Sequence, residues 1–521
     1  MRLWITRTLL VLLMMASAVA SAQTPAAHPL GVNLESVSDW SRSKIFADVM
    51  KSARTFGSMN APGDGTAKTD QNGWPISDFG VIVIADVPHI AGTYKLVFTG
   101  QARVLATAPL GKVLNPKYDA ATNTTRADVF VGRDATSLFL TFQQTQPTPD
   151  APPGGGVKGI HLWRPDAKEG QTFNTPFLTA LEPFSVLRCM DFTATNNNTL
   201  IRWEDRPHVT DARQTGPYGV AWEYAIELAN TTGKDLWINI PDQADDNYVR
   251  QLAKLFKEKL APGRSLYVEY SNELFNGFTK QHDRNIASAK AEFAAGKWTL
   301  PPAANTDPEL LGQLRLAKVM VDISQTFRAA YGFAPNDPAF FQKVRPVLCV
   351  QMPVPNRLAA MLEFIDKNYH PAGQATAGPT AHLDAVGVGT YPNLWKAPHR
   401  EMSAVDVLTT LENSVKEIKS QYPPMKVLAD KYHLHLLAYE GGPDVQGDQS
   451  FNAKLAAQIN PRMETLITQL LTDWYAAGGE LFCYYNLCGP WGKYGMWGLT
   501  EDIERETPKR TALNKIAGKA K

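Results

Sequence analysis

The fold is decided by residues 235–273, DLWINIPDQADDNYVRQLAKLFKEKLAPGRSLYVEYSNE. The stretch opens with a run of β-forming residues at 235–240 and closes with a second such run at 265–270. Between them, apolar residues recur at helical spacing over 248–260, after a pair of aspartates and before a Pro-Gly pair, which are typical helix start and stop signals. This order predicts a β–α–β unit with two parallel strands.

The same alternation continues on both sides of this stretch. Runs rich in β-branched, aromatic and other apolar residues lie at 30–34, 184–191, 235–240, 265–270, 345–350, 383–388, 434–439 and 480–486. Helical spacing is found between them, and the last expected helix covers 508–517. Eight strands joined by helices predict an α/β fold, a (β/α)8 TIM barrel. The long connection at 300–331 is expected to pack helices outside the fifth strand.

One section interrupts this pattern after the first strand and helix. From about residue 59 to residue 164 the chain consists of short strand-like runs separated by Gly, Pro and Asn clusters, with a Pro/Gly-rich loop at 147–156. The runs lie at 94–100, 127–132 and 136–142. We predict a small β-sandwich inserted into the barrel. The expected domains are a barrel formed by 28–59 and 165–521, and an inserted β-rich domain at 60–164.

Composition narrows the function classes. The 521 residues are 44% hydrophobic and 20% charged, which is typical of a globular protein. Lys and Arg number 52 against 51 Asp and Glu, so the chain lacks the basic excess that a nucleic acid partner requires. We expect no nucleic acid partner and favour a neutral polar substrate. The sequence does not indicate the oligomeric state.

The first 22 residues have the pattern of a secretory signal. Arg2 and Arg7 precede or flank the start of an apolar run, and small residues lead to Ala22, the expected cleavage position. The apolar run is shorter than the roughly 20 residues that a membrane span needs. We therefore expect an exported chain, periplasmic or secreted, with no membrane span once the signal is removed.

Four cysteines are too few and too scattered for a disulfide scaffold. Export permits a bridge, and the two pairings considered are Cys483 with Cys488 and Cys189 with Cys483; the sequence does not choose between them. No CxxC or HExxH pattern is present, so we expect neither a metal nor an organic cofactor.

In a barrel of this kind, reactive groups stand at the C-terminal ends of the strands. The candidate residues occupy these positions: Arg188 near the end of the second run, Asn272 and Glu273 after the fourth, Tyr391 after the sixth, Glu440 after the seventh, and Trp491 and Trp497 after the eighth. Four other acids also follow strands and compete with them: Glu35, Asp39, Asp191 and Asp242. Such acids are more often caps or substrate-positioning groups than catalysts.

Two carboxylates on opposite strands suit the hydrolysis of a glycosidic bond. One acid protonates the leaving oxygen while a second carboxylate attacks the anomeric carbon. The structural alternative is that these acids pair with Arg188 and have no catalytic role. The position of Glu273 and Glu440 at the ends of the fourth and seventh strands, with Gly441 and Gly442 following, favours the catalytic pair.

At these residues the chain resembles a known family. VEYSNE at 268–273 resembles the fourth-strand Asn-Glu motif of clan A retaining glycoside hydrolases, and LAYEGG at 437–442 resembles their seventh-strand nucleophile segment. The resemblance covers the barrel and not the inserted β-rich section. It implies a retaining O-glycosyl hydrolase that acts on a β-linked poly- or oligosaccharide.

The resemblance also assigns a role to each candidate. It implies that Glu273 is the general acid/base, that Glu440 is the nucleophile and that Asn272 hydrogen-bonds the sugar 2-hydroxyl. Tyr391 and Arg188 match groups that hold the nucleophile's carboxylate, and we expect Trp491 or Trp497 to offer a flat face to the sugar. Burial and the neighbouring charge should raise the pKa of Glu273, and the two donors should keep Glu440 ionised.

A different class of function remains open, namely a non-catalytic glycan-binding barrel protein of the cell envelope. A complete pair of acids argues against it, because binding alone needs no acid beside a nucleophile. The sequence leaves open the sugar, its linkage, internal or terminal cleavage, and the role of the inserted domain.

Overall fold

The computed structural model describes residues 28–296, 307–369 and 378–519. Eight parallel strands close into a barrel in the order β1-β15-β14-β13-β12-β11-β10-β9, and β9 pairs with β1 to complete the ring. Their bounds are β1 (Leu30–Asn33), β9 (Val186–Arg188), β10 (Asp235–Ile240), β11 (Leu266–Tyr270), β12 (Val344–Val350), β13 (Ala385–Thr390), β14 (His435–Gly441) and β15 (Leu481–Tyr484). The predicted barrel is confirmed, and every strand overlaps the run that predicted it.

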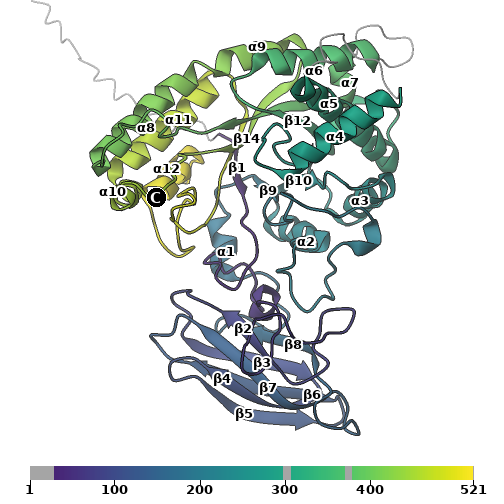
Figure 1. The fold of residues 1–521 in the computed structure, drawn as a ribbon, viewed down its shortest axis with the longest axis vertical. Coiled ribbons are helices and arrows are strands. Elements are labelled where there is room, and N and C mark those ends of the chain that lie inside the picture. Colours follow the sequence, from purple (N-terminus) through teal and green to yellow (C-terminus); the bar gives the residue numbers. More distant parts are fainter. Residues whose placement is uncertain (1–27, 297–306, 370–377, 520–521) are drawn as a thin grey trace, which may run out of the picture.

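Helices surround this barrel (Figure 1). They are α1 (Thr175–Ala180), α2 (Trp222–Thr232), α3 (Asp246–Lys259), α4 (Lys280–Ala294), α5 (Pro308–Tyr331), α6 (Pro355–Asn368), α7 (Gly378–His382), α8 (Ala404–Lys419), α9 (Tyr422–Lys431), α10 (Phe451–Gln458), α11 (Pro461–Ala476) and α12 (Pro508–Ile516). The helix expected in the deciding stretch is α3, and the Asp245 side chain caps it by accepting from the Tyr248 N–H. Within the expected connection at 300–331, α5 contacts β11 and β12.

The barrel strands are buried on both faces, which explains their nearly continuous apolar sequence. In β10, Trp237 points into the barrel, where its ring stacks on Tyr267 at 5.4 Å. Its neighbours Leu236 and Ile238 belong instead to the larger cluster between the strands and the helices. This alternation between the inner and the outer face decides which residues of a strand reach the barrel mouth.

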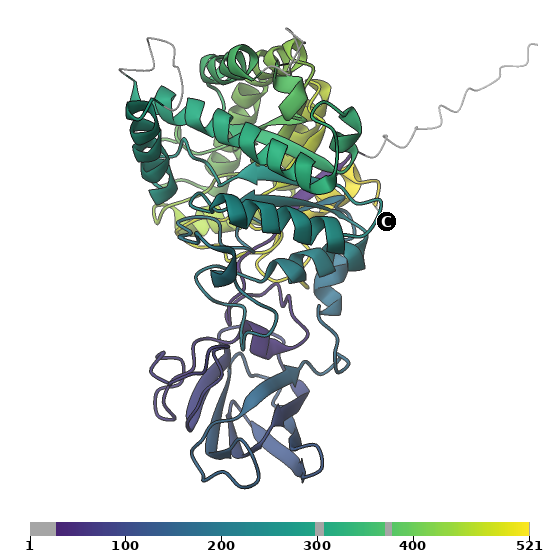
Figure 2. The same cartoon turned by 90° about the vertical axis from the view of Figure 1, so that its right-hand side faces the viewer.

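The section between β1 and β9 forms two antiparallel sheets, with the orders β2-β7-β4 and β5-β6-β3-β8. The strands are β2 (Phe79–Ile84), β3 (Gly92–Thr99), β4 (Gln101–Thr107), β5 (Lys112–Asp119), β6 (Thr124–Val131), β7 (Leu138–Gln146) and β8 (Lys158–Trp163). The two sheets share one buried cluster, in which Phe98 of β3 packs edge-on against Phe142 of β7 at 5.5 Å. Figures 1 and 2 show both sheets below the barrel.

Hydrogen bonds tie these sheets to the chain around β1. Asp48 accepts from the Leu162 N–H at 2.8 Å and contacts His161 Nδ1 at 2.7 Å, and the Ala85 N–H donates to the Asp39 carbonyl at 3.0 Å. The shared cluster of the sheets also includes Val49 and neighbouring residues that precede the expected boundary at residue 60. The domain boundaries themselves stay predictions.

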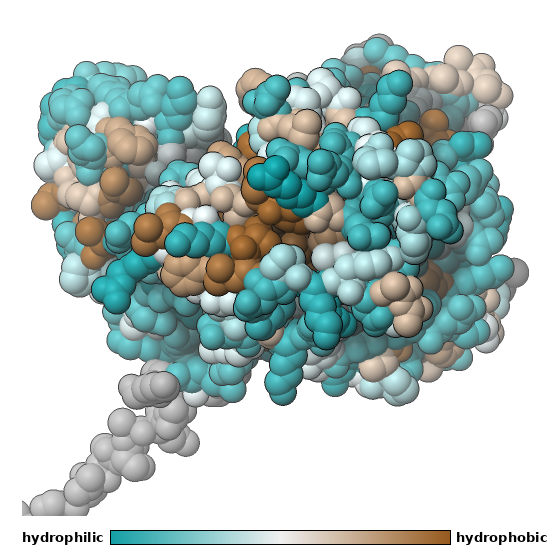
Figure 3. Space-filling model, turned by 90° about the horizontal axis from the view of Figure 1, so that it is seen from below, coloured by the Kyte–Doolittle hydropathy of each residue, from teal (hydrophilic) through white to brown (hydrophobic). Residues whose placement is uncertain are grey.

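Seen from the side of the sheets, the surface has a hollow flanked by hydrophobic side chains (Figure 3).

Two expectations concern disulfides and export. All four cysteines are buried free thiols, so neither of the two considered pairings is formed. The expected signal at 1–22 lies outside the described residues. In the described part of the chain, no helix combines the length and the apolar character needed to cross a membrane.

Candidate active site

A β-bulge places Glu440 at the barrel mouth. In the pairing of β14 with β13, Ala438 lies opposite Val388 but Glu440 lies opposite the next residue, Gly389, so one extra residue is inserted into β14. Such a bulge re-aims the side chains that follow it. Tyr439 points into the barrel, and Glu440, directly after it, is also held inside the mouth rather than turned outward.

Arg188 is the hub of the site. It ends β9, is completely buried, and donates through Nη1 to Glu440 Oε1 at 2.6 Å. Its Nη2 donates to Glu269 Oε2 and to Asn272 Oδ1, both at 2.9 Å, and Nη1 also donates to Asn33 Oδ1 at 2.8 Å. The guanidinium therefore orients groups from β1, β11 and β14 and the loop after β11 at once. The predicted contact between Arg188 and Glu440 is present.

Tyr391 holds the second oxygen of the same carboxylate. It follows β13, and its hydroxyl donates to Glu440 Oε2 at 2.6 Å. Burial, together with the charge of Glu440, raises the pKa of Tyr391 far above its ordinary value, so this hydroxyl keeps its proton and remains a donor. Both oxygens of Glu440 thus accept a short hydrogen bond.

Glu273 enters the same site from the loop after β11. Its backbone and that of Ser271 have positive φ angles of 45° and 57°, a conformation that costs free energy in residues other than glycine and is concentrated at functional sites. Its carboxylate accepts from the Tyr439 hydroxyl at 3.0 Å and from Asn276 Nδ2 at 3.0 Å. Because Tyr439 is the chain neighbour of Glu440, the structure brings the two predicted acids together.

Asn272 lies between them and is almost fully engaged. Its side-chain oxygen accepts from Arg188, and its Nδ2 donates to Asn196 Oδ1 at 3.2 Å. The Gln281 side chain donates to its backbone carbonyl at 3.1 Å. The amide is therefore rigidly oriented and retains one N–H of Nδ2 for a substrate hydroxyl.

Opposing influences act on the pKa of Glu440, whose ionised form stays a prediction. Burial raises the pKa of Glu440 to about 8; the charge of Arg188 lowers it, the charge of Glu273 raises it, and the donors Tyr391 and Arg188 lower it. Desolvation of the carboxylate exceeds the effect of its two donors, since Arg188 divides its charge between Glu440 and Glu269. Burial therefore favours the protonated form of Glu440, whereas Arg188 and Tyr391 favour its ionised form.

A cavity of about 460 Å³ adjoins the carboxylates on the side of β1 and β15. This volume is within the range of small-molecule sites. Its lining includes Glu35, Asp191, Tyr485 and Trp497, whereas Glu273 and Glu440 do not belong to it. The cavity begins next to Glu440, because the Tyr485 backbone N–H donates to the carbonyl of Gly441 at 2.9 Å.

The two predicted tryptophans have different positions. Trp497 lines the cavity, donates through Nε1 to Asp444 Oδ1 at 3.0 Å, and packs edge-on against Tyr485 at 5.8 Å. Trp491 is 4% exposed, and its Nε1 donates to the Gly498 carbonyl inside the protein. Trp491 therefore offers no face to a sugar, and of the two predicted alternatives Trp497 is the one that lies at the cavity. The ring of Trp491 supports the loop that carries Trp497.

The competing acids separate into two groups. Asp39 pairs with Arg54 and Asp242 pairs with Arg284, so both have structural partners. Glu35 and Asp191 instead line the cavity, and Asp191 accepts from the Tyr485 hydroxyl at 2.8 Å. Glu35 Oε1 accepts from the Ser41 hydroxyl at 2.6 Å, and burial raises the pKa of Glu35 to about 8.

Four site residues were missed from sequence: Asn33, Glu269, Tyr439 and Tyr485. Glu269 carried a usable signal, because it is a charged residue in an apolar strand at a position that alternation places on the inner face. A buried charge requires a partner of opposite charge. Arg188 is likewise a charged residue in a buried apolar strand, so the two could have been paired from sequence. Tyr439 and Tyr485 carried no such signal, since tyrosines are common in strands.

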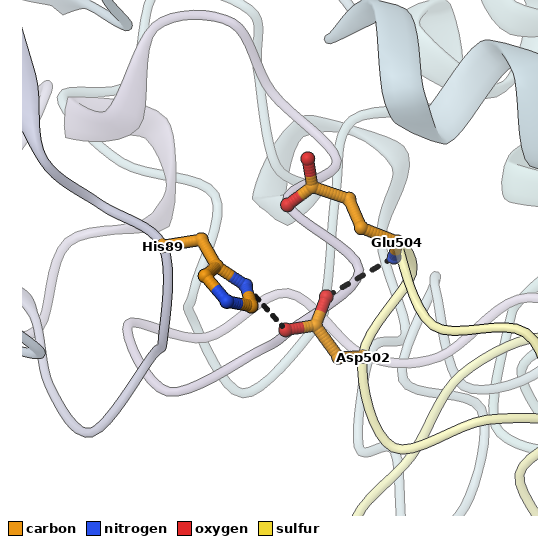
Figure 4. Close-up of side chains that lie close together, drawn as sticks. All are labelled: His89, Asp502 and Glu504. Atoms are coloured by element: carbon orange, nitrogen blue, oxygen red, sulfur yellow. Dashed lines mark hydrogen bonds and ion pairs between the residues drawn. The ribbon is translucent and has the colours of Figure 1, made fainter.

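One cluster outside the site has atoms suited to a metal. His89, Asp502 and Glu504 place one ligand atom each within 4.8 Å of one another (Figure 4). However, the buried ammonium of Lys44 already pairs with Glu504 and lies 3.9 Å from Asp502, which supplies the positive charge that a cation would bring. The cluster joins the loop after β2 to the loop after β15 by ion pairing. That the chain needs no metal stays a prediction.

No protein-family model and no curated protein matches the chain. A search of solved structures finds the GH51 arabinofuranosidase from Xanthomonas axonopodis pv. citri, with 12% identity, 66% of each chain covered and a TM-score of 0.39. It also finds a 4-O-α-L-rhamnosyl-β-D-glucuronidase from Fusarium oxysporum 12S, with 12% identity, 65% of this chain and 63% of the other covered, and a TM-score of 0.40.

A third similar structure is a GH5 xyloglucan-specific endo-β-1,4-glucanase from a metagenomic library, with 13% identity, 67% of this chain and 88% of the other covered, and a TM-score of 0.34. The chain matches slightly less than two thirds of the length of the first two, 66% and 63%. At this level of similarity, the function of the chain has to be argued from its own residues.

Proposed function

We propose that the chain is a retaining glycoside hydrolase that cleaves O-glycosidic bonds of a poly- or oligosaccharide by double displacement. One observation carries this proposal: Glu440 is held through both oxygens by Arg188 and Tyr391, and Glu273 enters the same barrel mouth through Tyr439. A structural ion pair needs no second acid in a strained loop beside it. The pair supports acid catalysis and nucleophilic attack at one bond.

In the first proposed step, Glu273 gives its proton to the glycosidic oxygen while an oxygen of Glu440 forms a bond to the anomeric carbon. The bond between that carbon and the leaving oxygen breaks, and the leaving sugar departs as an alcohol. In the second step Glu273 takes a proton from water, whose oxygen attacks the same carbon and releases Glu440. The hydrogen bond from Arg188 or Tyr391 to the attacking oxygen of Glu440 breaks in the first step and forms again in the second.

The raised pKa of Glu440 fits this scheme in a specific way. Attack requires the ionised form, and the ionised fraction increases as the pH rises towards 8. Arg188 and Tyr391 both favour the ionised form of Glu440. In the proposed complex with substrate, Glu273 and Glu440 share a single proton, which Glu273 holds. On the acidic side of the profile, the rate should therefore increase with pH as Glu440 ionises.

We propose that the substrate is β-linked, that the chain is exported by the signal at 1–22, and that the two inserted sheets form a sandwich. The shared cluster containing Phe98 and Phe142 supports the sandwich. The inserted segment also contributes Asp86 to the cavity wall, which supports a role for it in substrate binding.

The test is nucleophile rescue. Glu440→Gly should reduce the turnover of an activated aryl β-glycoside by about 10⁴-fold or more, and azide should restore part of it as a glycosyl azide. Glu273→Gln should lose activity on substrates with poor leaving groups, and Glu363→Gln, an exposed position on α6, is the matched control. Full hydrolysis by both site variants overturns the proposal. Glycan binding without turnover by the parent protein supports the non-catalytic alternative.

A further inference from the structure

Exposed aromatic side chains are confined to one part of the described chain. Among its large hydrophobic residues with high exposure, the aromatic ones are Trp40 at 56%, Phe278 at 103%, Trp395 at 83% and Tyr494 at 79%. Each lies in a loop that follows a barrel strand: after β1, β11, β13 and β15, respectively. Exposed aliphatic residues show no such restriction, since Leu110 lies in the turn between β4 and β5 and Val427 lies on α9.

These loops stand at the end of the barrel that carries Glu273 and Glu440. Their order around the barrel is informative, because β14 with Glu440 lies between β15 and β13. Trp40 and Tyr494 are therefore on one side of the nucleophile, and Trp395 and Phe278 are on the other. Trp40 and Tyr494 also line the cavity that contains Trp497.

Short chains of hydrogen bonds connect two of the exposed aromatics to the site. The Phe278 N–H donates to Asn276 Oδ1 at 3.1 Å, and Asn276 Nδ2 donates to Glu273 at 3.0 Å. The Trp395 N–H donates to Asn393 Oδ1 at 3.1 Å. The backbone of Asn393 bridges to Asp444, whose side chain accepts from Trp497. The backbone of each aromatic is thus fixed relative to a site residue.

The other two aromatics are restrained by cations. The Arg54 guanidinium lies 5.7 Å from the ring centre of Trp40, and the Lys493 ammonium lies 5.3 Å from that of Tyr494. This restraint lowers the conformational entropy that the rings of Trp40 and Tyr494 lose when a ligand covers them. Ordered loops that keep such rings in water indicate a ligand, because exposed apolar surface of this kind marks interaction sites.

The chemistry of the rim defines the ligand class. Aromatic faces contact the C–H faces of sugar rings, while acids and amides between them accept and donate hydrogen bonds to hydroxyls. The cavity wall carries Glu35, Asp86, Asp191 and Glu501 against one cation, Arg42. Such a wall disfavours uronic-acid polymers and suits a neutral glycan.

We propose that Trp40, Tyr494, Trp395 and Phe278 form an aromatic rim that binds a neutral glycan chain on both sides of the bond to be cleaved. The substrate is accordingly a polymer of several sugars, and cleavage is internal rather than terminal. This inference rests on the proposed function for its cleavage mode, whereas the binding of the glycan to the rim does not depend on catalysis.

Binding is tested with the inactive variant Glu440→Gln in native gels that contain one neutral polysaccharide each: hydroxyethylcellulose, xyloglucan, galactomannan, laminarin or linear arabinan. A polygalacturonate gel is the charged comparison. We expect retardation by at least one neutral polymer and none by polygalacturonate. Adding Trp395→Ala, Phe278→Ala, Trp40→Ala or Tyr494→Ala should weaken the retarding affinity about 3- to 10-fold each.

The matched control is Val427→Ala, which removes an exposed apolar side chain from α9 and should leave retardation unchanged. Thermal unfolding of every variant identifies a folding defect. Failure of all five neutral gels to retard the protein overturns the rim, as does retardation of all four aromatic variants equal to that of the parent. A polymer that is bound but never cleaved supports the rim and contradicts the hydrolase.

Cleavage mode is tested on the polymer that retards the protein most. The parent protein should lower the viscosity of the solution well before many reducing ends appear, because internal cuts shorten chains quickly. Reducing ends that accumulate without an early fall in viscosity contradict internal cleavage. Turnover of aryl glycosides without retardation in any gel leaves the proposed function intact and overturns the rim.

Discussion

Arg188 donates to Glu440 across 2.6 Å, although 252 residues separate the two in the chain. The guanidinium is completely buried and is shared with Glu269, so one positive charge serves two buried carboxylates. Burying three charges is costly unless each is paired and hydrogen-bonded. The same arrangement both orients the Glu440 carboxylate and leaves its pKa raised.

Removing Arg188 should destabilise the protein strongly. Arg188→Met leaves Glu269 and Glu440 buried without a cation, and breaking a buried pair in this way costs about 3–5 kcal/mol of the free energy of unfolding. Urea unfolding followed by circular dichroism measures the loss. Arg202→Ala removes an exposed pair with Asp205 and should leave the midpoint near that of the parent. Equal midpoints for both variants would contradict the hub role of Arg188.

Glu273→Gln should shift the pH dependence of Glu440 to lower pH. The charge of Glu273 raises the pKa of Glu440, so its removal favours the ionised nucleophile. Nucleophilic attack needs the ionised form of Glu440. The acidic limb of the pH profile of kcat/KM, expected near pH 8 in the parent protein, should therefore shift to lower pH. A 2,4-dinitrophenyl glycoside is the substrate, because its leaving group needs no acid. An unchanged limb, or one at higher pH, would show that the two carboxylates are not coupled.

Tyr391→Phe should produce the opposite shift. The hydroxyl lowers the pKa of Glu440 by donating to it, so its loss should move the acidic limb to higher pH. A hydrogen bond to a charged group contributes about 1.5–3 kcal/mol, which corresponds to a roughly 10- to 100-fold loss of kcat/KM at neutral pH. Tyr475→Phe, which removes a hydroxyl bonded to the Pro29 carbonyl, is the control and should keep the parent's profile.

Gly441 should not tolerate a side chain. A Cβ at this position would lie 2.4 Å from the Phe482 ring and from the Thr390 hydroxyl, and 2.8 Å from the Thr390 carbonyl, which is backbone. Gly441→Ala should therefore destabilise the protein by about 1–3 kcal/mol and displace the adjacent Glu440. Gly216→Ala is the matched control, because a Cβ there meets nothing within 4 Å. Melting temperatures and kcat/KM of the two variants separate the effects.

Lys509 should give the protein a distinct pH dependence of stability. It is buried, donates to the carbonyls of Met496 and Gly498 beside Trp497, and burial lowers its pKa to about 7. Because the unfolded chain keeps this lysine protonated up to about pH 10.5, its contribution to stability increases as the pH rises above 7.

Lys509→Met removes this contribution. The free energy of unfolding of the parent minus that of the variant should increase between pH 7 and pH 10, measured by urea unfolding at several pH values. A difference that is constant with pH would mean that Lys509 titrates normally. The variant should also raise KM, since the loop carrying Trp497 loses two hydrogen bonds.

The sequence by itself determined the local elements and the positions of the two candidate acids. Runs of β-branched, aromatic and other apolar residues predicted all eight barrel strands, and the aspartate pair at 245–246 predicted the start of α3, because these signals act over neighbouring residues. Strand ends marked Glu273 and Glu440, since a parallel barrel brings all C-terminal strand ends to one mouth.

Only the tertiary structure decided how side chains face and ionise. A bulge of one residue aims Glu440 into the mouth, and packing buries Trp491 while leaving Trp497 at the cavity. The pKa of Glu440 depends on burial and on an arginine shared with Glu269, and neither is a property of nearby sequence. Orientation and desolvation are set by contacts between distant segments, which a local pattern does not encode.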